Sequence, residues 1–264
     1  MEQILDFWFM FFVYAFLGWV VEVAFHVITK GKFINRGFLD GPYCPIYGFG
    51  VTAILYVLAP LMRNLPAVFG LSIVITTLIE LVGGFVLMKL FHKRWWDYSG
   101  EKHNIKGYIC PKFSVYWGIG ALIVVEIVHP VVSGTYHHLP VRLILLLDIA
   151  MGLLMLIDLA STVSRILGLN EELKELSEME RHIIHLSEVI GEHVTQDVLQ
   201  GEEEKQKAEE KYELLKKERD EKLAALSQKH RRMLAAFPTM KALDEREMFE
   251  KLKSRVKERI RKER

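Results

Sequence analysis

Acidic side chains interrupt the apolar stretches of this sequence, and they are the first residues whose type and position suggest chemistry. A carboxylate is costly inside a bilayer, so an acidic residue within an apolar span is a candidate for binding a substrate or an ion. The alternative role is structural, in which the carboxylate accepts hydrogen bonds from loop N–H groups and pins a helix bundle. Both roles remain open for this set, which comprises Glu22, Glu80, Glu126, Asp148 and Asp158.

Glu22 has several candidate partners close by in the sequence. His26 follows it by one helical turn, and the polar run after the first apolar stretch contains Asn35, Arg36 and Asp40. Through its bidentate guanidinium, Arg36 could hold an anionic headgroup, a phosphate or a substrate carboxylate. It could also pair with Asp40 or Glu22 inside the protein, and we favour this internal pair.

A Gly-x-x-Cys-Pro motif occurs twice, at Gly41 to Pro45 and at Gly107 to Pro111. Each copy has an Asn upstream (Asn35 or Asn104) and an aromatic, glycine-containing segment downstream. Because proline fits the first turn of a helix, each motif predicts the entrance of a helix. We interpret the pattern as two copies of one unit, in which a span with a Glu is followed by a loop, the motif and a second span.

The second loop opens with the run Trp95-Trp96-Asp97-Tyr98, which makes Asp97 a candidate beside Asn104. The tryptophans and tyrosines of both loops fit an interfacial aromatic belt. The full set of candidate substrate- or ion-binding residues contains no catalytic residue and is Glu22, His26, Asn35, Arg36, Asp40, Glu80, Asp97 and Asn104.

Cys44 and Cys110 are the two cysteines of the chain. Both fall on the side predicted below to be cytoplasmic, where thiols stay reduced, so no disulfide is expected. Zinc ligands generally occur as close pairs, whereas each cysteine stands alone, and no metal site is predicted. No cofactor is predicted either, and the Gly-x-x-x-x-Gly-Lys-Ser/Thr motif of a P-loop ATPase does not occur. We favour a packing role at the helix entrances.

Charge is distributed unevenly along the 264 residues. The net charge of +1 and the 25% of charged residues would suit a soluble protein. However, residues 1–165 are mostly apolar, whereas residues 170–264 are dominated by Glu, Lys and Arg. This asymmetry indicates that the two parts occupy different environments.

Apolar stretches of bilayer-spanning length, about 20 residues each, fill the first part. Several are apolar on all sides, as expected for helices that face lipid and one another. A soluble helical domain would have almost no polar surface here. We therefore predict an all-α, polytopic membrane helix bundle over residues 1–165, with five spans at roughly Ile4–Thr29, Cys44–Met62, Ala67–Phe91, Ser114–Val132 and Leu139–Arg165.

Lysine and arginine placement predicts the orientation of this bundle. Nothing basic precedes Lys30, and the second link has only Arg63, whereas the first and third links are basic and a charged tail follows the fifth span. The pattern predicts a multi-pass protein of the inner (plasma) membrane with its N-terminus outside and its C-terminus in the cytoplasm. Both polar loops then lie on the cytoplasmic side, so the two units are parallel repeats.

The tail is predicted to be helical. From Leu169 to Val194, apolar residues recur at three- and four-residue steps, as in an amphipathic helix with coiled-coil character. We assign residues 166–237 to a cytoplasmic amphipathic or coiled-coil helix, which is either a solvated spacer or a self-association element. Residues 238–264 are assigned to a basic amphipathic helix that could rest on anionic lipid, with nucleic acid as the less favoured partner.

Two blocks of the sequence resemble a known family. GKFINRGFLDGPYCPIYGFG, with Glu22 and His26 before it, and WWDYSGEKHNIKGYICPKFSVYWG are similar to small bacterial membrane proteins labelled ABC-transporter type IV, or CmpB-like permeases. The resemblance covers about Leu5 to Arg165 and leaves out the tail. It implies a multispanning, permease-like protein with a separate ATP-binding subunit as its expected partner, and it carries no catalytic or substrate residues with it.

Three hypotheses for the function follow. The leading one is a permease-like component of a transport system, embedded in membrane lipid, with a site lined by Glu22, Glu80, Arg36 and the two motif loops. The second is a membrane-anchored scaffold or sensor whose tail recruits partners. The third is a membrane enzyme that acts on a lipid headgroup with an acidic residue as general base, and we favour the two non-enzymatic hypotheses over it.

Overall fold

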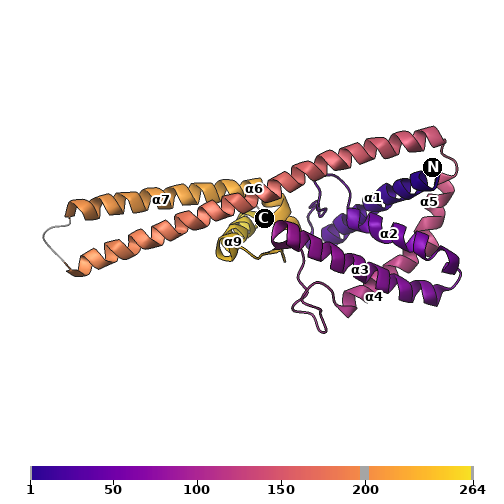
Figure 1. Ribbon diagram of the computed structural model, residues 1–264, viewed down its shortest axis with the longest axis horizontal. Helices are drawn as coiled ribbons and strands as arrows, with labels where there is room; N and C mark the ends of the chain where they lie inside the picture. Colours follow the sequence, from indigo (N-terminus) through magenta and orange to yellow (C-terminus); the bar gives the residue numbers. More distant parts are fainter. Residues whose placement is uncertain (1, 197–201, 263–264) are drawn as a thin grey trace. The chain divides into compact units, whose positions relative to one another are not determined.

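The computed structural model describes residues 2–196 and 202–262 (Figure 1). The chain forms two compact units, which are described separately. The first comprises Met1–Ser164 with Ala236–Lys241, and the second comprises Arg165–Ala235 with Ala242–Arg264. The described residues are predominantly helical, which confirms the predicted all-α class.

The first unit is a helix bundle with two polar loops. Its loops, residues 31–44 and 92–110, each precede a helix that begins at a motif proline. The two-residue strand β1 (Lys93–Arg94) pairs with β2 (Lys241–Ala242), whose first residue belongs to this unit. The helical elements are α1 (Glu2–Lys30), α2 (Pro45–Val57), η1 (Ala59–Leu61), α3 (Leu65–Phe91), α4 (Pro111–Ile123), η2 (Val124–Val128), α5 (His129–Tyr136) and the beginning of α6 (Val141–Gln196).

Within residues 2–196 and 202–262, four helical segments are long and apolar enough to cross a membrane: Gln3–Lys30, Leu65–Phe91, Pro111–Tyr136 and Val141–Ile190. The sequence predicted five membrane spans. The segment expected as the second span forms the 13-residue helix α2, about 20 Å long at 1.5 Å per residue, whereas a bilayer core is about 30 Å thick. Helix α2 ends at Val57, and its C-cap residue Leu58 leads into the short 3₁₀ turn η1.

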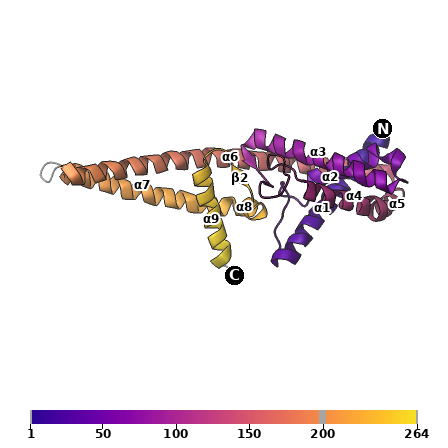
Figure 2. The ribbon, with the colours of Figure 1, turned by 90° about the horizontal axis from the view of Figure 1, so that it is seen from below.

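The helices of the first unit share one apolar core. Met10 and Tyr14 of α1 are buried with Ile54 of α2, Val68 of α3 and Ala121 of α4. Figure 2 shows these helices grouped together. Because lipid is as apolar as the side chains themselves, such helices associate through close packing rather than through a hydrophobic driving force.

Pro130 is accommodated without a break in the segment 111–136. A proline lacks the N–H that a helix needs and clashes with the carbonyl four residues earlier. The chain widens there into the π turn η2, which lies between α4 and α5, as is common where a helix absorbs an irregularity. The neighbouring His129 Nδ1 lies 2.9 Å from the Tyr14 hydroxyl of α1, which ties this turn to the core.

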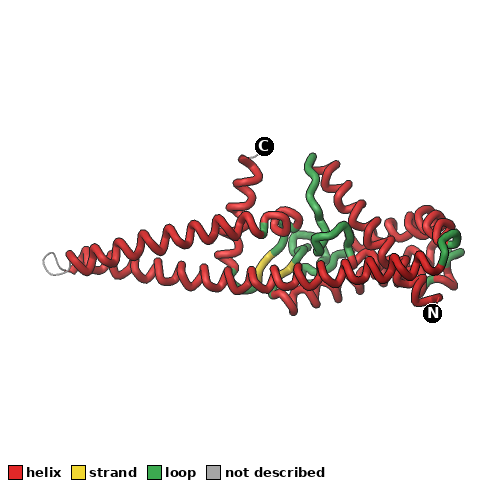
Figure 3. The backbone as a smooth tube through the Cα atoms, turned by 90° about the horizontal axis from the view of Figure 1, so that it is seen from above, coloured by secondary structure: helices red, strands yellow, loops and turns green. Residues whose placement is uncertain are grey.

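In the second unit, α6 pairs with α7 (Glu202–Lys229) in an antiparallel hairpin (Figure 3). Three ion pairs show that the two helices are antiparallel, because the residue number on α7 rises from pair to pair while the residue number on α6 falls. These pairs are Glu180–Arg219, Glu175–Lys222 and Glu172–Lys229. The apolar stripe predicted from Leu169 onward lies inside this unit, where Leu169, Leu173 and Leu176 are buried. Self-association through a coiled coil stays a prediction.

Helix α8 (Arg231–Ala236) and helix α9 (Arg246–Lys262) follow α7. The apolar residues of α9 that the sequence places on one face include Phe249, Leu252 and Val256, and all three are buried. Because this face is covered within the chain, it is not open to lie on a bilayer. Binding of anionic lipid by the basic face of α9 stays a prediction.

Candidate functional site

The two polar loops meet at one end of the first unit. The Phe38 ring of the first loop lies 5.4 Å from the Trp95 ring of the second and 6.0 Å from Phe91 at the end of α3. This contact agrees with the prediction that both loops lie on the same side. Several aromatic residues assigned to an interfacial belt, including Tyr43, Trp95 and Tyr108, are instead buried within the protein.

Both Gly-x-x-Cys-Pro motifs form helix entrances. Cys44 and Cys110 occupy the N-cap positions of α2 and α4 in extended conformation, and the prolines follow in the first turn. Neither thiol caps its helix, and both cysteines are free and buried. The geometry gives the cysteines the packing role that the sequence favoured.

The first loop is held by two polar residues that the sequence singled out. The Asn35 Oδ1 accepts hydrogen bonds from Trp19 Nε1 at 2.8 Å and from the Gly37 N–H at 2.9 Å, and its Nδ2 donates to the Asp40 carbonyl at 2.6 Å. Asn35 and the backbone of Asp40 therefore shape this loop.

Asp158 on α6 anchors the same loop from outside. Its carboxylate accepts hydrogen bonds from the N–H groups of Asp40 at 3.1 Å and Gly41 at 2.7 Å, and from the Tyr43 hydroxyl at 2.9 Å. This is the structural role that the sequence left open for the acidic residues in apolar stretches. Asp158 satisfies loop N–H groups and fixes the bundle.

The second loop uses Asn104 and Asp97 in the same way. Asn104 Oδ1 accepts the Gly107 N–H at 2.9 Å, and Asp97 accepts the Ser99 N–H at 3.0 Å and the Ser99 hydroxyl. Gly107 has φ +74°, and a Cβ there would lie 2.5 Å from Asp97 Oδ1. Only glycine fits this position without strain.

Lys241 fastens the segment 236–241 to the second loop. Its Nζ lies 2.5 Å from Asp97 Oδ2, and the Asp97 side chain is only 6% exposed. Burial alone would raise the pKa of Asp97. The hydrogen bonds from Lys241 and from the Ser99 hydroxyl and N–H have the larger effect, and they lower this pKa to about 2. This contact joins the chain after α8 to the loop that carries Tyr98.

Replacing Lys241 with Ala is expected to loosen the second loop. One charge-assisted hydrogen bond to a mostly exposed lysine is lost, which corresponds to about 1 kcal/mol or less. Amide hydrogen exchange over residues 95–109 should rise about two- to fivefold, and Lys216→Ala, which removes an exposed pair within α7, should leave it unchanged. Equal exchange in wild type and Lys241→Ala would contradict this role.

The same contact sets a pH dependence. The folded pKa of Asp97 is about 2, below the value of about 3.9 for a free aspartate. A lowered folded pKa means that the stabilisation is complete above about pH 4 and is lost as the pH falls toward 2. The protection of the second loop should therefore be constant across neutral pH.

Glu22 forms the centre of the first polar cluster within the spans. Its Oε2 lies 3.0 Å from Arg36 Nε, and its Oε1 accepts the Tyr47 hydroxyl at 2.6 Å. Arg36 Nη1 also lies 3.4 Å from His26 Nδ1. This is the internal pair favoured from the sequence, and it neutralises the Glu22 charge.

Glu80 forms a second cluster, which differs from the first. Its Oε1 accepts the Tyr98 hydroxyl at 2.8 Å, and the Trp117 indole is the other hydrogen-bonding group beside the carboxyl group. Glu80 is 5% exposed, and its Oε2 accepts no hydrogen bond of normal geometry from the described residues. Burial and the neighbouring carboxylate raise the pKa of Tyr98, so its hydroxyl remains a donor.

An aromatic contact connects the two clusters. The Tyr47 ring, whose hydroxyl binds Glu22, meets the Trp117 ring edge-on at 5.3 Å between centroids, and Trp117 lies beside Glu80. We define the Glu22–Glu80 site as Glu22, Arg36, Tyr47, Glu80, Tyr98 and Trp117. Sequence reasoning missed the three aromatic residues as site members, although Tyr47 and Trp117 stand in the aromatic segments just after the two motifs.

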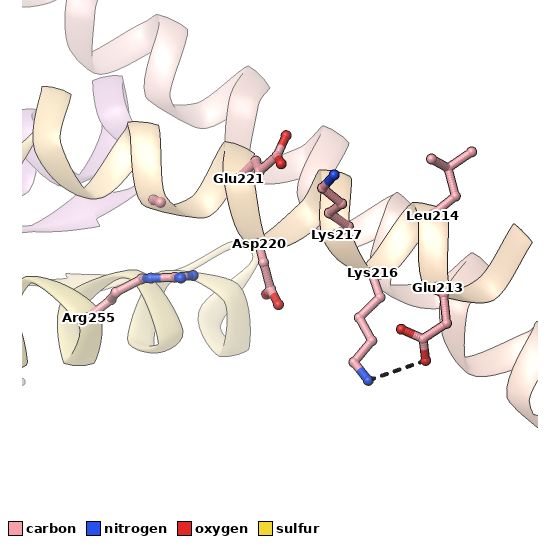
Figure 4. A pocket seen from close by; sticks show the side chains of 8 residues that line it. Glu213, Leu214, Lys216, Lys217, Asp220, Glu221 and Arg255 are labelled. Atoms are coloured by element: carbon pink, nitrogen blue, oxygen red, sulfur yellow. Dashed lines mark ion pairs between the residues drawn. The ribbon is translucent and has the colours of Figure 1, made fainter. Parts of the chain in front are cut away.

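The second unit contains an open surface hollow of about 750 Å³ along α7, with Arg255 of α9 at its edge (Figure 4). Its lining is charged with both signs, and Lys216 pairs with Glu213 at 3.7 Å. Small-molecule sites are generally enclosed and mostly apolar, so this hollow is not a candidate for one. Among the described residues, no group of three or more His, Cys, Asp or Glu side chains is placed to hold a metal ion.

Comparison with known proteins identifies the first unit. The family described as "Putative ABC-transporter type IV" matches residues 9–163. The chain belongs to this family. Curated proteins and solved structures gave no match. For this ABC-transporter type IV chain, the match includes every residue of the Glu22–Glu80 site and both loops, and with the four apolar helices it identifies a membrane protein related to transport.

Proposed function

We propose that the chain is the permease-like component of a transport system and that the Glu22–Glu80 site lies on the route of its substrate. The observation that carries the proposal is the Tyr47–Trp117 contact, which joins two carboxylates from two different apolar helices into one site. Ionisable residues within membrane spans are expensive and mark substrate or ion pathways. The chain is not itself the ATPase, and a separate ATP-binding subunit supplies the energy.

A five-crossing topology fits this proposal. The loops meet at one end of the first unit, and α3 runs about 40 Å back to that end over its 27 residues. Helix α2, the turn η1 and the residues up to Asn64 therefore carry the chain from the loop end to the far end, although α2 is short. With the basic loops in the cytoplasm, the N-terminus lies outside, and the loops are the surface for the ATP-binding subunit.

Cysteine labelling tests this topology. Arg63→Cys should react with a membrane-impermeant maleimide applied to intact cells, because residue 63 lies at the far end. Lys102→Cys, in the second loop, should react only after permeabilisation. The native Cys44 and Cys110 are buried, so their background should be low. Labelling of both introduced cysteines from the same side would contradict the five-crossing arrangement.

Purification in mild detergent tests the transport proposal directly. An ATP-binding subunit should co-purify with the full chain, and the complex should hydrolyse ATP. Glu22→Gln and Glu80→Gln should keep the subunit bound but remove function in cells. If no ATPase co-purifies, and if deletion of residues 165–264 removes function while both variants retain it, the chain is a scaffold or sensor instead.

A further inference from the structure

We propose that the Glu80 part of the site binds an organic ammonium cation, and that this is the substrate class of the transport component. The inference rests on the function proposed above. It concerns Glu80, the rings of Tyr98 and Trp117 beside its carboxyl group, and the ring of Tyr47, which meets Trp117.

Charge balance is the first argument. Glu22 has the Arg36 guanidinium at 3.0 Å. Among the residues that the structure describes, the two groups beside the Glu80 carboxyl group, the Tyr98 hydroxyl and the Trp117 indole, are both neutral. A buried carboxylate is stabilised most by a cation in direct contact, because charges interact strongly where water is excluded. A bound cation would do for Glu80 what Arg36 does for Glu22.

The unused carboxyl oxygen is the second argument. Glu80 Oε1 accepts the Tyr98 hydroxyl at 2.8 Å, whereas the buried Oε2 accepts no hydrogen bond of normal geometry from the described residues, the neighbouring Trp117 indole included. Buried polar atoms without a partner are rare in native structures. A ligand that donates an N–H to Oε2 would complete this carboxylate, so an ammonium ion with at least one N–H is favoured over a quaternary one.

The surrounding rings are the third argument. Phe113 covers one face of Tyr98, with centroids 4.6 Å apart, and Tyr47 meets Trp117 edge-on at 5.3 Å. The face of an aromatic ring attracts a cation, and sites for alkylated ammonium groups are commonly built from such rings. The combination of one carboxylate with several rings fits an ammonium ion with alkyl substituents.

The oxygen donors argue against a metal ion. Hard metal cations take about six or more oxygen ligands. Near Glu80, the Thr77 hydroxyl donates to Ser114 at 2.8 Å, and the Ser114 hydroxyl donates to the Cys110 carbonyl at 3.2 Å. Both hydroxyls donate their hydrogens inside the protein, and among the described residues no second carboxylate joins Glu80 in a group of three or more His, Cys, Asp or Glu side chains that could hold a metal ion. The donor set therefore favours a cation that needs one carboxylate and aromatic contact.

Binding to the purified full-length chain in lipid nanodiscs tests this inference, with methylammonium and tetramethylammonium as probes and calorimetry as the measurement. Methylammonium should bind saturably and more tightly than tetramethylammonium. Glu80→Gln should weaken methylammonium binding about tenfold or more, because a hydrogen bond to a charged group is lost. Trp117→Leu should also weaken it. Asp148→Asn should leave methylammonium binding unchanged. Asp148 also stands in an apolar stretch and its Oδ2 has no hydrogen-bond partner among the described residues, but it lies outside this site.

Thermal unfolding of each variant separates loss of binding from loss of fold. If Glu80→Gln fails to fold, folded Trp117→Leu, which keeps the carboxylate and removes a ring of the site, must weaken methylammonium binding for the inference to stand. No saturable binding by the folded wild type, or equal binding by folded Glu80→Gln, would overturn the inference. Methylammonium binding without a co-purifying ATPase would support an ammonium site at Glu80 and reject the transport proposal. An ATP-hydrolysing complex that does not bind methylammonium would support the transport proposal and reject the ammonium site.

Discussion

Replacing Arg36 with Ala is expected to destabilise the first unit by about 1–3 kcal/mol, because it leaves the Glu22 carboxylate without its cation. The two side chains are each 26% exposed and lie 3.0 Å apart, so the loss should be smaller than for a fully buried pair. Denaturant unfolding in detergent micelles measures the effect. Because Arg36 also lies beside His26, the ends of α1 and the first loop should separate.

Two further variants isolate the cause of this loss. Glu22→Gln combined with Arg36→Ala should recover part of the stability, because no charge is then left unpaired. Lys112→Ala breaks an ion pair with Glu101 whose side chains are 52% and 36% exposed, so it should cost well under about 1 kcal/mol. A double variant that is less stable than Arg36→Ala alone would show that the pair is not what stabilises this region.

Gly48→Ala is expected to separate α1 from α2 and to destabilise the bundle by about 1–3 kcal/mol. A Cβ at Gly48 would lie 2.7 Å from both the Phe11 ring and the Phe11 carbonyl oxygen, and the backbone of α1 cannot give way easily. The shift would pull Tyr47 away from Glu22. Loss of stability and loss of the Tyr47 hydrogen bond should therefore appear together.

Gly50 provides the matched control in the same helix. A Cβ at Gly50 would meet no atom within 4 Å, so Gly50→Ala should be neutral or stabilising by up to about 1 kcal/mol, the helix preference of alanine over glycine. The two variants differ only in the face of α2 that they occupy. Equal stability of Gly48→Ala and Gly50→Ala would contradict close packing at Gly48.

Much of the first unit was predictable from local chemistry. Proline at the first turn of a helix and an apolar run behind it predict the starts of α2 and α4, because both signals depend on a few adjacent residues. The same-side placement of the loops followed from Lys and Arg counts. The short length of α2 did not, because the apolar run continues beyond Val57 while the helix ends in the turn at Pro60.

The different roles of the acidic residues could not be predicted from the sequence. Glu22, Glu80 and Asp158 all stand in apolar stretches, yet Asp158 anchors a loop, Glu22 pairs with Arg36 and Glu80 has only neutral donors. These roles depend on contacts between residues 14 to 118 positions apart, which periodicity does not reveal. Tyr98 was assigned to an interfacial belt because composition alone cannot distinguish a ring that faces the membrane interface from one that faces a carboxylate.

The Lys241 contact was also beyond sequence reasoning. The tail was expected to be separate from the spans, whereas residues 236–241 belong to the first unit and Lys241 binds Asp97. Asp97 precedes Tyr98, and the Tyr98 hydroxyl donates to Glu80, so Asp97 and Tyr98 connect Lys241 to the buried carboxyl group. A single lysine in a charged tail gives no sign of such a partner in the sequence.

ATP-dependent uptake of labelled methylammonium into vesicles, measured with the complex that co-purifies with the chain, tests the central claim most directly. The wild type and Asp148→Asn should accumulate the label when ATP is present. Glu80→Gln and Glu22→Gln should lose most of this uptake, and the double variant should lose no more than the single ones, because both residues belong to one site. ATP-dependent uptake that persists in the double variant, or that is absent from an ATP-hydrolysing wild-type complex, would contradict the claim.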